Sequence, residues 1–302
     1  MGISRYNIVK WYKMFAGKSV LHVDQGVGQM FEANKIAGYF NDMTMKVTMQ
    51  MDCVDKRELP KQETEQGDHI YFPVAVFQFG LGLWDLFLKT NEDRYREMFV
   101  KCAEWALEKQ ESNGAWNNFF FVYPDNPYGA MAQGEGASLL IRAWELTKDD
   151  KYLEAARNAI SFMLIPVEDG GTAKYEGEDL ILLEYTHLAP VLNGWIFSAI
   201  GLYDIWLATN NEDYKQSFDR SIKSLLRFLP QFDCNYWSDY DLNKHITSLF
   251  YHRLHIAQLK ALYLMTGREA FKEYAERWEK YLNNPLYKSF ATLKKAAQKI
   301  RE

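Results

Sequence analysis

A short pattern repeated four times along the chain constrains its fold more than any other feature. In LFLKTNEDRY, WELTKDDKY, WLATNNEDY and YLMTGREAF, a threonine is followed five positions later by an aromatic residue. Successive threonines are 57, 62 and 57 residues apart. A repeat of this period indicates one supersecondary unit used four times. The pairs are Thr90 and Tyr95, Thr147 and Tyr152, Thr209 and Tyr214, and Thr266 and Phe271.

Each copy of the pattern joins two segments of helical character. The preceding segments, such as MAQGEGASLLIRAWEL and LNGWIFSAIGLYDIWL, are rich in small and apolar residues, and the following ones, such as LEAARNAISFML, are amphipathic. Small residues allow helices to approach closely, whereas charged faces need water. We therefore predict a mainly α protein, an (α/α) toroid or barrel of about four helical hairpins with inner helices wrapped by outer ones. An open solenoid is the alternative.

Residues 1–67 differ from the repeats and form a predicted N-terminal unit, with the toroid over residues 68–302. KSVLHVDQGVGQMFEANKIAGYF and MTMKVTMQMDCV show β-type stretches with Gly and Asn-Asp turn signals. We predict a short helix at the start of the chain, followed by a β-hairpin or extended arm packed on the toroid. RELPKQETEQGD is predicted to be a polar linker.

The composition of the chain indicates which classes of ligand and partner to expect. Aromatic residues make up 16% of its 302 residues, which suits a ligand cleft that stacks on sugar rings. A net charge of −5 predicts no nucleic-acid partner, because phosphate neutralisation needs a basic face. The absence of a long apolar run predicts no membrane span. Three cysteines without CxxC spacing, and an N-terminus without a signal-peptide pattern, favour a cytoplasmic location.

Residues that could carry chemistry gather in the long loops that follow the outer helices, at one predicted mouth of the ring. His252 and His255 have i,i+3 spacing, but no HExxH motif or Cys partner accompanies them, so no metal is predicted. Both histidines could equally hydrogen-bond at a helix start. No Ser or Cys nucleophile and no phosphate-binding Gly loop stands out, and no cofactor is predicted. The candidates are Tyr128 to Glu135 in YGAMAQGE, Glu184, Tyr185, Tyr240, Asp241, Tyr251, His252, Arg253 and His255.

Five blocks, in order, resemble a known family: YFPVAVFQFGL, YGAMAQGEGASLLIRAWELT, EYTHLAPVLNGWIFSAIGLYD, YDL and YHRLHIAQLKAL. Over roughly residues 70–280 the chain is similar to the C-terminal catalytic domain of the D-glucuronyl C5-epimerases that act on heparosan and heparan sulfate precursors. The resemblance implies an (α/α) barrel with a cleft for a uronate-containing polysaccharide and a proton-transfer site, and it suggests a homodimer. It places the family's EEYP-type motif on Glu184 and Tyr185, its YDL tyrosine on Tyr240 and its YH…HI.QL tyrosine on Tyr251.

The chain departs from that family at the residue after YDL, where the family has an arginine and this sequence has Asn243. Lys244 or Arg253 is then predicted to anchor the substrate carboxylate. The spacing from Tyr240 to Tyr251 is also shorter, and the large β-sandwich of the animal enzymes has no room in this chain.

The implied reaction removes a proton from C5, alpha to a carboxylate, and returns one to the opposite face, so two acid/base groups must flank the sugar. We predict Glu184 and Tyr251 as this pair, with Tyr185 and Tyr240 as hydrogen-bonding or relay groups that could exchange roles with them. A tyrosine base is disfavoured by roughly 4 kcal/mol at pH 7, which a nearby Arg253 or protonated His255 would reduce. The other predicted substrate contacts are Tyr128, Gln133, Glu135 and Asn193.

Three other functions fit the same residues. A uronate polysaccharide lyase shares the C5 proton abstraction but then expels the C4 substituent. A glycoside hydrolase needs two carboxylates, which Glu184 with Asp239 or Asp241 could supply. A glycan-binding toroid would use the aromatic loops without proton chemistry.

Overall fold

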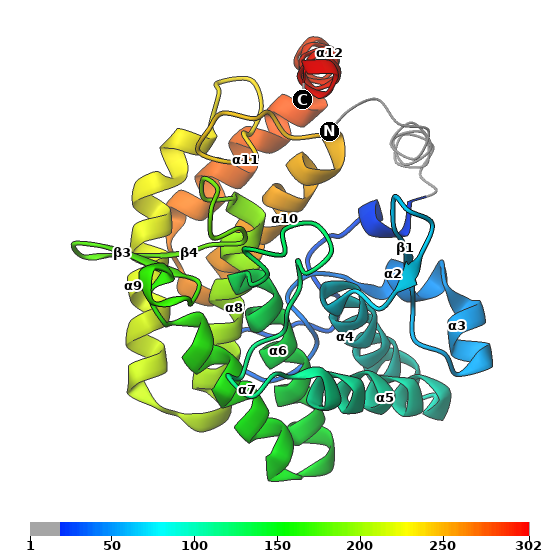
Figure 1. Cartoon of the computed structure of the whole chain (residues 1–302). Helices are drawn as coiled ribbons and strands as arrows, with labels where there is room; N and C mark the ends of the chain where they lie inside the picture. The colour runs from blue at the N-terminus through cyan, green and yellow to red at the C-terminus, as the bar shows by residue number, and fades with distance from the viewer. Residues whose placement is uncertain (1–18, 302) are drawn as a thin grey trace.

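The computed structural model describes residues 19–301, with side chains as far as residue 299. Four helical hairpins form an (α/α) toroid, which confirms the predicted fold class (Figure 1). The inner helices are α4 (Pro73–Thr90), α6 (Ala130–Thr147), α8 (Leu192–Thr209) and α10 (Leu249–Thr266). The outer helices are α5 (Asp93–Lys109), α7 (Asp150–Met163), α9 (Glu212–Phe228) and α11 (Glu269–Asn283). The helix predicted at the start of the chain lies outside the described residues.

Small residues let the inner helices pack closely, as their composition predicts. A Cβ atom built on Gly201 of α8 would lie 2.5 Å from the Cα atom of Gly134 of α6, so neither helix could carry a side chain at this crossing without moving away. The inner helices are buried over most of their length, whereas the outer helices alternate buried and exposed positions. The main hydrophobic core therefore lies between the two rings.

The repeated threonines close four turns of the same geometry. In each, the threonine Oγ1 donates to the carbonyl four residues earlier at 2.7–2.9 Å. The same oxygen accepts from the backbone N–H two residues later at 3.3–3.4 Å. The residue between them adopts a left-handed conformation and ends the inner helix. These residues are Asn91, Lys148, Asn210 and Gly267.

The N-terminal segment corrects part of the prediction. MTMKVTMQMDCV forms two short helices, α2 (Thr44–Thr48) and α3 (Met51–Lys56), rather than a β-type stretch. Tertiary packing overrides the β propensity here, because the turn carrying Met43 and Val47 lies against Gly82 of α4, where a Cβ would be 2.4 Å from the Met43 carbonyl oxygen. Residues 19–42 form turns and irregular structure with the isolated antiparallel bridge Val27–Asn41, apart from the 3₁₀ turn η1 (Val20–His22).

The hairpin of this segment lies where the sequence predicts a linker. Strands β1 (Gln62–Glu63) and β2 (His69–Ile70) pair antiparallel within and just after RELPKQETEQGD. A second hairpin, β3 (Ala173–Glu176) and β4 (Asp179–Leu182), follows the 3₁₀ turn η2 (Val167–Asp169). The 3₁₀ turn η3 (Leu229–Phe232) follows α9, and helix α12 (Pro285–Arg301) extends the chain beyond the fourth hairpin (Figure 1).

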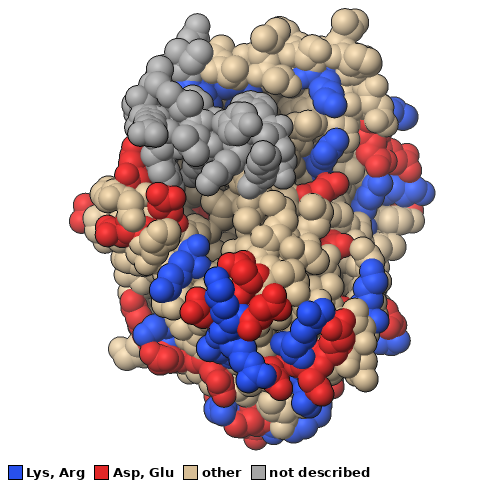
Figure 2. Space-filling view, turned by 90° about the vertical axis from the view of Figure 1, so that its right-hand side faces the viewer, with Lys and Arg blue, Asp and Glu red and all other residues tan. Residues whose placement is uncertain are grey.

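Charges of both signs are intermixed on the face that carries α3 and α5, and Lys and Arg form no separate basic area on that face (Figure 2). Among the helices of residues 19–301, none combines the length and apolar character needed to cross a bilayer.

Candidate active site

Glu184 lies at the end of β4, enclosed by the starts of two inner helices. A Cβ on Gly194 of α8 would lie 2.2 Å from Glu184 Oε2, and a Cβ on Gly129, before α6, would lie 2.1 Å from the Glu184 carbonyl oxygen. Both positions therefore need glycine. The N–H of Ala130 donates to the Leu183 carbonyl at 2.8 Å and holds the start of α6 against the segment that carries Glu184. As a result the Glu184 residue is only 7% exposed.

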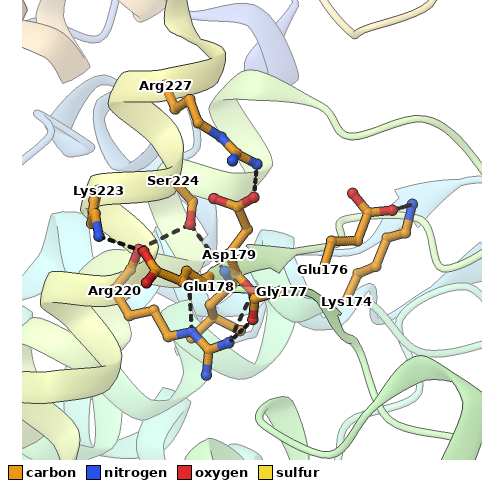
Figure 3. Close-up of polar contacts among 10 residues, drawn as sticks. Lys174, Glu176, Gly177, Glu178, Asp179, Arg220, Lys223, Ser224 and Arg227 are labelled. Carbon is orange, nitrogen blue, oxygen red and sulfur yellow. Dashed lines mark hydrogen bonds and ion pairs between the residues drawn. The ribbon is translucent and has the colours of Figure 1, made fainter.

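The hairpin that leads to Glu184 is fastened to α9 (Figure 3). Arg220 donates to the carbonyls of Gly177 and Glu178, both at 2.8 Å, and the Leu180 N–H donates to Ser224 Oγ at 3.0 Å. Lys223 pairs with the Glu178 carboxylate at 2.8 Å, and Arg227 pairs with Asp179. These contacts hold β4, and hence Glu184, on the rigid outer ring.

Three tyrosines from separate segments surround Glu184. Tyr185 stacks on Phe119 with ring centroids 4.6 Å apart, and its hydroxyl interacts with the Glu184 carboxylate. The ring of Tyr240 meets that of Tyr251 edge-on at 5.0 Å, and the Tyr240 hydroxyl interacts with both Tyr185 and Tyr251. Tyr251 lies in the first turn of α10, which Ser248 caps. The structure thus brings together the four residues predicted to be catalytic.

Burial governs the protonation of this cluster. It raises the pKa of Glu184 to about 7, and the hydrogen bond from Tyr185 opposes the shift only in part. Burial also raises the pKa of Tyr251 far above its usual value, and the Glu184 charge raises it further. The same two causes, in the same order, raise the pKa values of Tyr185 and Tyr240. All three phenols are therefore neutral proton donors near pH 7.

The histidines of α10 form a buried network behind the cluster. The Ser238 N–H donates to His252 Nδ1 at 3.2 Å, so Nε2 carries the hydrogen and donates to the Trp278 carbonyl at 3.0 Å. Ser238 Oγ lies 3.2 Å from His255 Nδ1, and Trp237 stacks on His252 at 3.7 Å. Burial lowers the pKa of His252 to about 3 and that of His255 well below its usual value. Neutral His255 therefore supplies no positive charge to Tyr251, contrary to the predicted role.

The two predicted cations are exposed, unlike the buried cluster. Arg253 is exposed, because a residue two positions from Tyr251 points to the opposite side of a helix. Lys244 is exposed as well, bonds the Gln231 carbonyl and lies 3.9 Å from Asp239. Both side chains are thus exposed whereas Glu184 is buried, and their role as carboxylate anchors stays a prediction.

Two further residues predicted to contact substrate, Gln133 and Tyr128, bond to the loop before α6 and not to the catalytic cluster. Gln133 exchanges hydrogen bonds with the backbone of Trp116 at 2.9 and 3.1 Å. The Tyr128 hydroxyl donates to Glu111 at 2.6 Å. The possible hydrolase carboxylates also have other partners: Asp241 bonds His245 Nδ1 at 2.7 Å, and Asp239 faces Lys244.

Asn193 and Glu135 remain near the cluster. Asn193 precedes Gly194 on α8, and its carbonyl accepts from Gln258 of α10 at 3.2 Å. Glu135 of α6 accepts from Gln78 of α4 at 2.8 Å and is electrostatically coupled to Glu184. Within residues 19–301, Asn193 Oδ1, Glu135 Oε2 and Glu184 Oε2 have no hydrogen-bond partner. Buried polar atoms of this kind can accept hydrogen bonds from water or from a polar ligand.

The sequence prediction missed Phe119, which stacks on Tyr185, Gln78, which bonds Glu135, and Lys46, whose charge lowers the pKa of Glu135. Phe119 supports the ring of Tyr185, and its place in NNFFFVYP was an available signal, since consecutive aromatics in a loop at the mouth suit ring contacts. Gln78 and Lys46 gave no such signal. Their place in the site depends on how α2, α4 and α6 pack together.

Solved structures of low identity share this fold. The unsaturated glucuronyl hydrolase of Bacillus sp. GL1, described as responsible for the degradation of glycosaminoglycan, has a TM-score of 0.53 at 12% identity over 79% of this chain and 66% of that one. The alpha-1,6-mannanase of Salegentibacter sp. HEL1_6 has a TM-score of 0.50 at 14% identity over 78% of this chain and 68% of that one. Both confirm the (α/α) toroid.

Relatives in sequence point to one family. A D-glucuronyl C5-epimerase of Caenorhabditis elegans is 28% identical over 223 residues, 64% of this chain and 36% of that protein. An uncharacterized protein of Methanocaldococcus jannaschii is 35% identical over 156 residues, 50% of this chain and 51% of that one. The chain thus spans about half or less of these relatives. Residues 110–280, more than half of the chain, match the family described as D-glucuronyl C5-epimerase C-terminus, and the protein belongs to that family.

Proposed function

We propose that this protein is a polysaccharide epimerase that converts D-glucuronate to L-iduronate residues in a heparosan-like chain. The observation that carries the proposal is the buried Glu184 carboxyl group beside three neutral phenols, Tyr185, Tyr240 and Tyr251. Family membership and the name of the Caenorhabditis elegans relative support the same reaction.

Glu184 is the proposed base. A pKa of about 7 makes its carboxylate a stronger base than an ordinary glutamate, while roughly half of the molecules are still ionised at pH 7. Its Oε2 atom has no hydrogen-bond partner among the described residues and is free to take the C5 proton. Gly194 allows the carboxyl group to lie flat against α8 and keeps its position fixed.

Tyr251 is the proposed acid that returns a proton to the opposite face. Its raised pKa keeps the hydroxyl protonated in the resting enzyme, and the interaction with Tyr240 offers a path for replacing the proton. A resting phenolate is disfavoured here, since neither Arg253 nor a charged His255 lies beside it. Tyr251 acts as base only in the reverse reaction, after it has given up its proton.

Deuterium exchange tests this proposal. Incubation of the protein with heparosan in D₂O should place deuterium at C5 of the uronate, with chain length unchanged and iduronate detected by NMR. Unsaturated ends that absorb ultraviolet light would instead identify a lyase, and new reducing ends a hydrolase. Binding without any of these changes would identify a glycan-binding protein. Absence of C5 exchange over a panel of uronate polymers would contradict the proposal.

A further inference from the structure

The proposed reaction needs a positive charge beside the buried cluster. A uronate carries a carboxylate next to C5, and removing the C5 proton increases the negative charge on that group. Lys244 and Arg253 are exposed, whereas Glu184 is buried. We propose that Lys46, on α2 of the N-terminal segment, binds the carboxylate of the reacting uronate. This assignment rests on the proposed function.

The packing of α2 brings Lys46 into the toroid. The turn before Lys46 lies directly on Gly82 of α4, where any larger residue would displace it. The Lys46 side chain is buried, with a residue exposure of 4%. Its ammonium group lies 3.3 Å from the carbonyl oxygens of Val20 and Leu21 in η1.

The position of η1 connects Lys46 to the catalytic cluster. The residue after Leu21 is His22, whose ring meets that of Tyr251 at 5.9 Å and that of Phe250 at 5.1 Å. The segment that holds the ammonium group therefore also lies against the first turn of α10. Lys46 is thereby linked to the proposed acid through one short turn of backbone.

On the other side, Lys46 is coupled to the proposed base through Glu135. Glu135 is completely buried and is in electrostatic contact with both Lys46 and Glu184. Gln78 donates to Glu135 Oε1 at 2.8 Å, whereas Oε2 has no hydrogen-bond partner within residues 19–301. Lys46 and the unpartnered Glu135 Oε2 are thus coupled electrostatically to the proposed base, near which a uronate carboxylate must be held.

The charges of the pair favour an incoming anion. Burial lowers the pKa of Lys46 to about 8, so the amine still carries its proton at pH 7. Burial raises the pKa of Glu135 more strongly than Gln78 and Lys46 lower it. A largely protonated Glu135 leaves the Lys46 charge uncompensated and can itself donate a hydrogen bond to a carboxylate.

The second buried cation of the toroid shows how a structural charge is held. Arg142 forms an ion pair with Asp204 at 2.6 Å and donates to the backbone carbonyls of Ser138, Ala37 and Gly38. Buried charges are normally paired in this way. Lys46, by contrast, has no carboxylate within ion-pair distance in the described part of the chain. A substrate carboxylate would complete its contacts.

Equilibrium binding of matched ligands tests the role of Lys46. A heparosan hexasaccharide is compared by calorimetry with its carboxyl-reduced form, in which each uronate carboxylate is replaced by CH₂OH. Wild type should prefer the acidic ligand, and Lys46→Met should lower this preference about tenfold or more. Lys46→Arg should retain most of it. Lys46→Gln is measured in parallel, so that the conclusion does not depend on one variant folding.

A control and two contrary outcomes complete the experiment. Lys260→Met removes a cation that is paired with Glu279 and should leave the preference unchanged. Equal weakening of both ligands in the Lys46 variants, or an unchanged preference, would overturn the carboxylate assignment. A wild-type protein that prefers the acidic ligand but exchanges no C5 proton would contradict the proposed function alone.

Discussion

The two ends of the toroid are built in different ways. One end, here called the closed end, carries the four threonine turns. These turns share the same hydrogen bonds, and each contains one residue in a left-handed conformation. At the open end, the loops between hairpins differ in length and content and bring Glu184, Tyr185, Tyr240 and Tyr251 together. In the four turns the threonine hydroxyls have local backbone partners, whereas Glu184 Oε2 at the open end is buried without a hydrogen-bond partner among the described residues.

This difference assigns stability mainly to the turns of the closed end and the proposed function to the loops of the open end. A turn that satisfies its own backbone groups contributes to folding and needs no ligand. A buried carboxyl group with a raised pKa destabilises the folded state when it ionises, and such strain is typical of a site prepared for chemistry. Changes at the open end should therefore alter activity more than stability, and changes at the closed end the reverse.

The largest expected effect is that of Glu184→Gln, which removes the proposed base while retaining its shape. We expect C5 deuterium exchange to fall by about 10³-fold or more, because the amide cannot accept the proton. The measurement is exchange per folded molecule, with circular dichroism to verify folding. Exchange within tenfold of wild type would place the base elsewhere.

Tyr251→Phe should reduce exchange by about 10²- to 10³-fold, since a water or Tyr240 can replace the lost donor only poorly. Tyr128→Phe is the matched control, because it also removes a phenol at the mouth, but one that bonds Glu111 rather than the cluster. Equal losses in the two variants, measured as kcat for exchange, would show that Tyr251 has no special role.

Sequence reasoning predicted the scaffold and the four catalytic candidates because both leave local patterns. The repeat identifies the hairpins, and short motifs identify Glu184, Tyr185, Tyr240 and Tyr251. Arg253 was assigned from proximity in sequence, although its direction on α10 places it in solvent.

Other parts of the molecule leave no local pattern. The stretch MTMKVTMQMDCV is predicted to be β-type, and packing on Gly82 decides for helix instead. Lys46 and Gln78 join the site only through contacts between distant segments. A repeat or motif cannot reveal such contacts.

The pH dependence of the free energy of unfolding tests the raised pKa of Glu184. The pKa of Glu184 is about 7 in the folded protein and near its ordinary value of 4.5 when unfolded. Between these values the folded state binds a proton that the unfolded state has released, so the free energy of unfolding decreases as pH rises. For this one group the full loss is roughly 3 kcal/mol above pH 7.

Urea unfolding at pH 4 and pH 8 isolates this contribution. Glu184→Gln should be more stable relative to wild type at pH 8 than at pH 4, by up to roughly 3 kcal/mol. Asp85 shifts in the same direction but is common to both proteins, so it cancels in the comparison. The charge of Glu184 raises the pKa of Glu135, so in the variant Glu135 shifts less and adds to the difference in the same direction. A difference independent of pH would mean that Glu184 titrates normally.

Two glycines of α8 separate damage to the site from damage to the scaffold. Gly194→Ala would place a Cβ 2.2 Å from Glu184 Oε2, and Gly201→Ala would place one 2.5 Å from Gly134 Cα. Each should destabilise the fold by about 1–3 kcal/mol, because both sites are closely packed. Only Gly194→Ala should also lower exchange per folded molecule, since it displaces the base. Similar C5 exchange in both variants would show that Gly194 does not position the proposed base.

The smallest effect is expected at the closed end, where Lys148 occupies the left-handed position that Gly267 fills in the fourth turn. Lys148 has φ of 56° and Gly267 has φ of 64°, and a side chain in this conformation is unfavourable. Lys148→Gly should therefore raise the free energy of unfolding by about 1 kcal/mol. The loss of the weak, exposed ion pair between Lys148 and Glu145 reduces this gain slightly. C5 exchange should not change. Gly267→Ala is the reciprocal change and should lower stability by a similar amount. If either variant altered exchange per folded molecule, the two ends of the toroid would be energetically coupled, and their separation into scaffold and site would fail.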